Sequence, residues 1–157
     1  MLFFEPKRVY RAVKMDVPEE PYTVPLSEAR VVRTGEQVTL LAWGAMLFEA
    51  LSAAEEVMKE GIDVEVIDLR TLWPLDIDTV VNSVKKTGRL VVVHEAPRTC
   101  GFGSELVTLV TERAFLHLEA PPVRVTGFDT PFPLTHEREY LPLAHRIAPA
   151  LKKTARY

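Results

Sequence analysis

Two adjacent polar residues, His94 and Glu95, follow the most apolar run of the chain, Leu90 to Val93. A histidine titrates near neutrality, so the pair has the residue types of a general acid and a general base. Adjacent residues on a strand point to opposite faces, however, and the two side chains are not expected to reach one substrate atom. A polar pair that lines an interface or fixes a loop is therefore the favoured interpretation, with an acid–base site as the alternative.

A glycine-rich turn, Gly101-Phe-Gly-Ser104, opens a predicted helix just after this strand. Glycines at a helix N-terminus can let a phosphate group approach the backbone. A dinucleotide-binding motif needs a third glycine where this sequence has Leu106, and the phosphate-loop pattern Gly-Lys-Ser/Thr is missing from the sequence. We therefore interpret Ser104 as a helix N-cap that follows a tight turn.

The remaining reactive side chains are isolated in the sequence. Cys100 is the single cysteine, and a lone cysteine is usually inert. His117, His136 and His145 lack the spacing of a metal site. The sequence therefore predicts neither a bound metal nor a complete active site.

A short prolyl loop, Asp129 to Pro133, is the best candidate for a contact surface. Prolines restrict the backbone, and Phe132 is expected on the outside of the loop. Aromatic anchors often dominate the energy of protein interfaces. A turn packed on its own core is the alternative.

The elements that must position these residues alternate between strand and helix. Strands are predicted at 38–42, 64–69, 90–93 and 123–126, and helices at 45–60, 77–86, 102–118 and 143–155. Asp76 is expected to cap the second helix, and Phe115 to lie on the buried side of the third. The strands are apolar on both faces, which is typical of a parallel sheet covered by helices. The predicted fold is therefore α/β, with three layers and a mostly parallel sheet.

The first part of the chain has a different character. Pro18, Pro21 and Pro25 fall in one stretch and favour an extended arm that lies along a neighbouring domain or subunit. We therefore divide the chain into an N-terminal arm, residues 1–33, and one domain, residues 34–157.

Composition excludes several classes of protein. The 157 residues include 19 Lys and Arg against 22 Asp and Glu, so charge alone does not favour nucleic acid as a partner. Charged residues interrupt every apolar run before membrane-spanning length, and no signal peptide is expected. A single cysteine fits a reducing compartment, so the predicted location is cytoplasmic.

Four ordered motifs resemble one protein family. They are Phe4 to Arg11, Val64 to Asp76, Lys86 to Arg98 and Val125 to Pro133. In this order they resemble stretches of the β subunits of thiamine-dependent 2-oxoacid dehydrogenases, the E1 components, over essentially the whole chain. The versions His-Glu-Ala-Pro-Arg and Phe-Asp-Thr-Pro-Phe-Pro are most similar to the branched-chain, 2-oxoisovalerate type, with pyruvate as the alternative substrate.

The resemblance implies the transketolase C-terminal fold, a mostly parallel sheet of about five strands. The additional strand is expected at an edge, antiparallel, with Arg30 to Arg33 as the candidate. Family β subunits are longer, and their thiamine-activating glutamate and catalytic histidine belong to an N-terminal pyrimidine-binding domain. The α subunit holds thiamine diphosphate and magnesium. The resemblance thus implies that this chain itself binds no cofactor and supplies no catalytic residue.

The resemblance also implies partners. These are the E1 α subunit, a second β subunit related by a two-fold axis, and the subunit-binding domain of the E2 acyltransferase. The candidates for these interfaces are Phe102, Asp129, Phe132 and Tyr157. Nucleic acid and membranes are not expected as partners. Two alternatives stay open: an autonomous enzyme that uses His94 and Glu95, and a free-standing nucleotide-binding α/β module.

Overall fold

The computed structural model describes residues 2–157. Within them, one five-stranded sheet has the order β1-β3-β2-β4-β5. The strands are β1 (Arg30–Arg33), β2 (Val38–Ala42), β3 (Val64–Asp68), β4 (Leu90–His94) and β5 (Val123–Thr126). The helices are α1 (Met46–Met58), α2 (Ile77–Thr87), α3 (Gly103–Ala114), α4 (Glu137–Tyr140) and α5 (Ala144–Ala155), with short 3₁₀ helices η1 (Lys7–Val9) and η2 (Phe115–His117). None of the helices in the described range has the length and apolar character needed to cross a membrane.

Four strands of the sheet run parallel and one runs antiparallel. β2 pairs in parallel with β3 and β4, and β4 pairs in parallel with β5. β1 lies antiparallel to β3 at one edge, which confirms the expectation for Arg30 to Arg33. Every residue of β2 and β4 is buried, because these apolar runs face helices on both sides.

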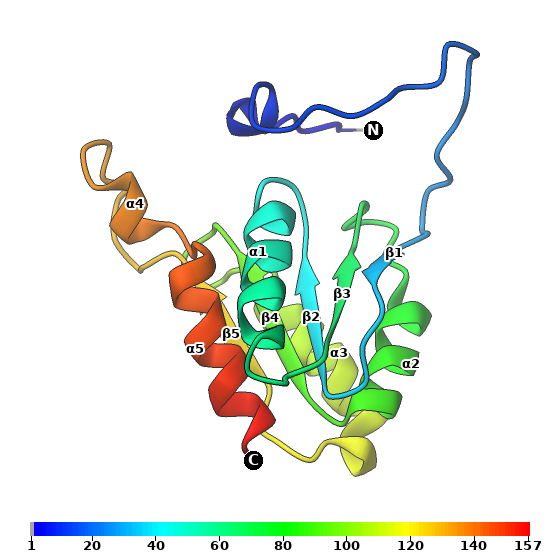
Figure 1. Ribbon diagram of the computed structural model, residues 1–157, viewed down its shortest axis with the longest axis vertical. Coiled ribbons are helices and arrows are strands. Elements are labelled where there is room, and N and C mark those ends of the chain that lie inside the picture. The colour runs from blue at the N-terminus through cyan, green and yellow to red at the C-terminus, as the bar shows by residue number, and fades with distance from the viewer. Residues whose placement is uncertain (1) are drawn as a thin grey trace.

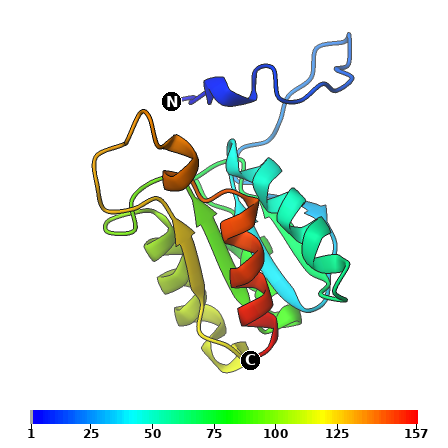
Figure 2. The ribbon, with the colours of Figure 1, turned by 60° about the vertical axis from the view of Figure 1, so that its left-hand side comes forward.

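Helices cover both faces of the sheet, as the three-layer prediction requires. α1 and α5 pack together on one face, and α2 and α3 on the other (Figures 1 and 2). The buried residues of α1 recur at helical spacing and are Met46, Ala50, Ala53, Ala54 and Val57. Each face has its own apolar cluster. Full burial of a valine or leucine side chain contributes roughly 1.5–3 kcal/mol, so the two clusters are the main source of stability.

The second predicted helix begins and ends as the sequence indicates. Asp76 caps α2 by accepting a hydrogen bond from the backbone N–H of Thr79 at 3.1 Å. Gly88 follows the helix with a φ of 69°, a conformation that a residue with a Cβ adopts only with strain. The cap and the glycine stop together fix where the chain enters β4.

The third predicted helix is shorter than expected. α3 ends at Ala114, where a φ of −136° interrupts the helical rotation before η2 begins. As a result Phe115 is 66% exposed, and its predicted place on the buried side is wrong. The N-cap interpretation of Ser104 is also wrong. Phe102 occupies the N-cap position, and the Ser104 hydroxyl accepts a hydrogen bond from Arg124.

The chain before β1 lies outside the sheet. Its residues are mostly exposed, and both ribbon views show it passing beyond the carboxyl ends of the parallel strands (Figures 1 and 2). It contacts the domain at η1, where Arg8 pairs with Glu49 of α1 at 2.6 Å. The C-terminus lies at the opposite end of the sheet (Figure 1). The N-terminal arm therefore lies where the parallel strands end, and the C-terminus lies where they begin.

Candidate functional site

His94 closes β4 and is almost completely buried at the carboxyl end of the sheet, with 1% of its surface exposed. Its ring stacks on Trp43, with centroids 5.5 Å apart and planes inclined by 16°. Trp43 in turn contacts Phe102 edge-on, at 6.0 Å. Among residues 2–157, neither ring nitrogen of His94 has a partner with good hydrogen-bond geometry. Packing against aromatic rings therefore holds this histidine.

The glycine-rich turn makes room for the same ring. A Cβ on Gly101 would lie 2.5 Å from Cε1 of His94, and a Cβ on Gly103 would lie 2.5 Å from its Nε2. Contacts this short do not occur, so any side chain at either position would displace the histidine. The two glycines that the sequence offers as a phosphate cradle thus serve to accommodate an imidazole ring.

His94 and Glu95 lie in different surroundings. Burial, and next the positive charge of Arg124, lower the pKa of His94. Glu95 is an exposed residue, but partial burial of its carboxyl group raises its pKa. The positive charge of Arg8 acts to lower this pKa, and the negative charge of Glu137 raises it further. Alternation along the chain therefore places the imidazole ring inside and the carboxyl group outside.

An apolar hollow of about 260 Å³ lies beside His94. Its walls come from the ends of β2 and β4, from the start of α3 and from the arm, and they include Pro6, Trp43, Leu72 and Phe102. Glu95 is the one charged side chain that the described part of the chain places in these walls. Such a lining favours small apolar groups and provides little to bind a phosphate.

Contacts at Asp129 and at Phe132 hold the prolyl loop in place. Asp129 accepts hydrogen bonds from the backbone N–H of Thr99 at 2.8 Å and from its hydroxyl at 2.7 Å. These bonds hold the pKa of Asp129 below its usual value. Phe132 packs edge-on against Tyr140, with centroids 5.1 Å apart, and is still 48% exposed. The loop therefore presents a rigid aromatic side chain at the surface.

The four interface candidates do not share one surface. Asp129 and Phe132 belong to the loop that follows β5, and Phe102 is partly buried against Trp43 at the start of α3. Tyr157 is 67% exposed and lies at the other end of the sheet, where Figure 1 marks the C-terminus. The structure therefore separates the candidates into two regions.

Sequence reasoning missed a group of three arginines beside β5: Arg98, Arg124 and Arg146. Arg146 donates to the carbonyl oxygens of Tyr140 at 2.7 Å and Thr126 at 2.8 Å, and its guanidinium lies 4.4 Å from the Phe128 ring centroid. The three residues come from separate segments and bind backbone carbonyl groups. No local motif links such residues, so only the fold reveals the group.

Magnesium and thiamine diphosphate do not fit the residues that surround these features. Magnesium prefers oxygen ligands held in near-octahedral geometry. Within residues 2–157, no three His, Cys, Asp or Glu side chains gather where they could hold a metal ion. The hollow beside His94 is apolar and is small for a diphosphate-bearing cofactor.

The chain is similar to known proteins along its whole length. It is 50% identical over 157 residues to the 2-oxoisovalerate dehydrogenase subunit beta 2, mitochondrial, of Arabidopsis thaliana, with 100% of this chain and 44% of that protein covered. It is 48% identical over 157 residues to the pyruvate dehydrogenase E1 component subunit beta of Acholeplasma laidlawii, with 99% of this chain and 48% of that protein covered. The chain therefore spans about half the length of these relatives, and the resemblance to E1 β subunits is confirmed for that part.

The fold points to the same family. A solved split-gene transketolase, described as an inactive beta4 tetramer, superposes with a TM-score of 0.77 at 27% identity, covering 92% of this chain and 46% of that one. A family model described as transketolase, C-terminal domain, matches residues 27–147. The matched region includes all five strands of the sheet. The chain therefore belongs to the transketolase C-terminal domain family.

Proposed function

We propose that the chain is the C-terminal domain of the E1 β subunit of a 2-oxoacid dehydrogenase, and that it serves subunit association and E2 docking. The observation that carries this proposal is 50% sequence identity, over the whole of this chain, to a 2-oxoisovalerate dehydrogenase β subunit. The substrate of the whole enzyme is then a branched-chain 2-oxoacid, with pyruvate as the alternative because an E1 β subunit of that type is 48% identical.

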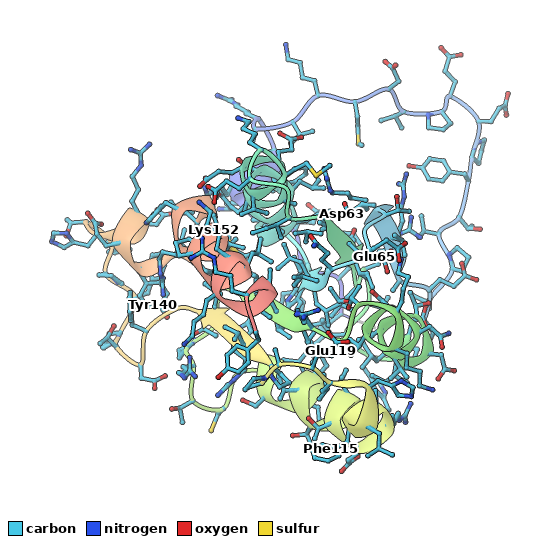
Figure 3. The ribbon with its side chains drawn as sticks, turned by 60° about the horizontal axis from the view of Figure 1, so that its bottom comes forward. Asp63, Glu65, Phe115, Glu119, Tyr140 and Lys152 are labelled. Carbon is cyan, nitrogen blue, oxygen red and sulfur yellow. The ribbon has the colours of Figure 1, made fainter. Side chains whose placement is uncertain are left out.

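Exposed apolar side chains support a role in assembly. Phe115 and Leu116 end the α3 segment, with Leu116 92% exposed, and Figure 3 shows Phe115 at the outer rim of the molecule. Trp73, between β3 and α2, is 90% exposed. Phe115 and Leu116 are adjacent, and adjacent exposed apolar groups mark interaction sites more often than a single residue such as Trp73 does.

Three partners follow from the proposal. The E1 α subunit supplies the cofactor-binding half of the enzyme, and a second β subunit meets this domain across a two-fold axis, the commonest symmetry of oligomers. Phe132 and the start of α3 at Phe102 are our candidates for the β–β contact. The E2 subunit-binding domain has a basic surface, for which Asp129 and, in the other region of the surface, the carboxylate of Tyr157 are alternative candidate acidic groups.

This domain contributes no catalytic group in the proposal. Thiamine diphosphate, held with magnesium by the complete enzyme, supplies the electron sink for decarboxylation. The residues of this chain bind neighbouring subunits and keep the sheet rigid. His94 packs inside the domain, where burial lowers the pKa of its ring.

Calorimetric titration with an E2 subunit-binding domain tests the docking role. We expect binding that weakens severalfold in Asp129→Ala, because an acidic group that faces the basic partner is removed. Asp78→Ala is the matched control, since Asp78 is an exposed carboxylate on α2. Equal affinities for Asp129→Ala and the unaltered chain would remove Asp129 from the interface, and absence of any binding would remove the docking role.

An activity assay tests the assignment of a non-catalytic domain. The purified chain, supplied with thiamine diphosphate and magnesium, is expected to leave 2-oxoisovalerate and pyruvate unchanged. Decarboxylation that disappears in His94→Ala would instead establish the autonomous enzyme.

A further inference from the structure

A basic groove of about 560 Å³ runs along the free edge of β5. It lies between the strand, the loop that follows it and the outer side of α5. The basic side chains in its lining are Arg98, Arg124, His145 and Arg146. β5 is the last strand of the sheet on this side, so its outer backbone groups face the groove.

Arginine side chains occupy the outward carbonyl groups of β5. Arg98 donates to the carbonyl oxygen of Arg124 at 3.3 Å, and Arg146 donates to that of Thr126 at 2.8 Å. Arg124 in turn donates to the carbonyl oxygen of Arg98 at 2.8 Å, so these two residues bind each other's backbone. A sixth strand needs these carbonyl groups as acceptors, so the edge is closed to an extended peptide that would pair with it.

The groove is left with hydrogen-bond donors. In a strand, the N–H and C=O of one residue face the same side, so the N–H of Thr126 faces the groove between the two capped carbonyl groups. Those carbonyl groups are two residues apart, or about 7 Å along the strand. The two guanidinium groups that bind them therefore flank one backbone donor, an arrangement suited to a compact anion.

The positive charge of the groove is only partly offset within the described residues. No carboxylate in residues 2–157 lies within ion-pair distance of Arg98, Arg124 or Arg146. Asp129 also lines the groove, and although its two carboxylate oxygens accept hydrogen bonds from Thr99, its negative charge acts on Arg98 and offsets part of the positive charge. A chain with a net charge of −3 thus concentrates unpaired positive charge at one strand edge.

We propose that this groove binds a phosphate ester of a small organic molecule. The phosphate lies between the guanidinium groups of Arg98 and Arg146, above Thr126, a residue that is 4% exposed. The organic part lies against the apolar lining from Val123, Pro149 and Ala150. The volume of the groove falls in the range of small-molecule sites and exceeds what an inorganic phosphate fills. The inference does not depend on the proposed assembly role, although the groove adjoins the proposed docking loop because Asp129 lines it.

Amide NMR of the ¹⁵N-labelled chain tests the site with AMP, ribose 5-phosphate, inorganic phosphate and adenosine as probes. We expect saturable shifts of the Thr126 amide with both esters, weaker shifts with inorganic phosphate, and none with adenosine. Arg98→Ala should weaken ester binding about tenfold, because one flanking guanidinium is lost. Arg113→Ala, a half-exposed arginine on α3, should leave it unchanged.

Arg98 is exposed and donates one long hydrogen bond, so its removal leaves the core intact. Circular dichroism of each variant checks this directly. Arg146→Gln, which removes the other flanking guanidinium, provides a second variant with the same expected loss of affinity. The proposal is overturned if neither ester binds at millimolar concentration, if both arginine variants bind as the unaltered chain does, or if hexaglutamate binds at Thr126 and the esters do not.

Discussion

At the scale of single residues, the carboxyl end of the sheet is organised around a buried histidine. Trp43 covers one face of the His94 ring, and Gly103 leaves space at its edge. The sequence signal for this arrangement is present, since a histidine at a strand end is followed by two closely spaced glycines. It cannot be distinguished from a phosphate cradle by pattern alone, because both uses require the backbone to approach another group closely.

The unfolding free energy should depend on pH through His94. Its pKa is lowered by burial first and by Arg124 second, from a usual value of 6.5. Below that value the unfolded chain takes up a proton at His94 before the folded chain does. Stability is therefore fully present above pH 6.5 and falls at lower pH, by up to about 1.4 kcal/mol per pH unit.

Urea denaturation at a series of pH values measures this dependence. His94→Phe, which keeps an aromatic ring in the same space, should flatten the slope below neutrality. His117→Gln is the control, since His117 is exposed on η2. An unchanged slope in His94→Phe would show that other groups cause the dependence.

Gly103→Ala should destabilise the domain by about 1–3 kcal/mol, because the added methyl group would meet His94 and the ring has no space to move. Alanine favours a helix over glycine by roughly 1 kcal/mol, which offsets only part of this cost. In a His94→Ala background the same substitution should cost much less. Gly61→Ala, at a φ of 81° with no atom nearby, should cost the same in both backgrounds. Additive effects of Gly103→Ala and His94→Ala would contradict the contact.

At the scale of elements, most of the fold could be predicted from local patterns. The runs at β2 and β4 are mostly apolar, those at β3 and β5 place apolar residues around Glu65 and Arg124, and Asp76 and Gly88 mark the two ends of α2. The order of the strands could not be predicted, because it depends on contacts between distant segments. The exposure of Phe115 could not be predicted either, because helical spacing in the sequence does not show that α3 ends at Ala114.

Removal of the α2 cap should lower the unfolding free energy. Asp76 accepts bonds from the backbone N–H groups of Thr79 and, at 2.9 Å, of Ala29. Asp76→Ala should therefore cost about 1–2 kcal/mol, and the lost bond to Ala29 also loosens the entry to β1. Asp78→Ala, an exposed carboxylate in the first turn, is the control and should cost less.

The contribution of Asp76 should also disappear in acid. Burial acts to raise the pKa of this carboxyl group, but the bonds from Thr79 and Ala29 outweigh it and the pKa is lowered from 3.8. The stabilisation is thus present above pH 3.8 and is lost as pH falls through the lower folded value. Urea denaturation of Asp76→Ala and the unaltered chain should therefore converge at low pH, and a constant difference would contradict the role of the charge.

At the scale of the whole molecule, exposed aromatic side chains lead us to expect self-association. We predict a dimer, or a monomer–dimer equilibrium, that sedimentation across a concentration series will detect. If Phe132 lies at the centre of the contact, Phe132→Ala should weaken the dimer by more than about 1 kcal/mol. Phe48→Ala, a partly exposed phenylalanine on α1, should have no effect. A strictly monomeric chain at high concentration would exclude the dimer.

The placement of α5 has a consequence for synthesis on the ribosome. α5 is the last of the helices along the described chain, yet with α1 it covers a whole face of the sheet. Until Ala155 has emerged from the ribosome, a strip that includes Val91, Val93 and Val125 has no helix above it. A nascent chain with this uncovered valine surface is the kind of intermediate that aggregates or that chaperones hold. The domain therefore cannot finish folding until α5 has been made. A ribosome that stalls shortly before α5 would leave a chain whose uncovered valines can aggregate or bind a chaperone.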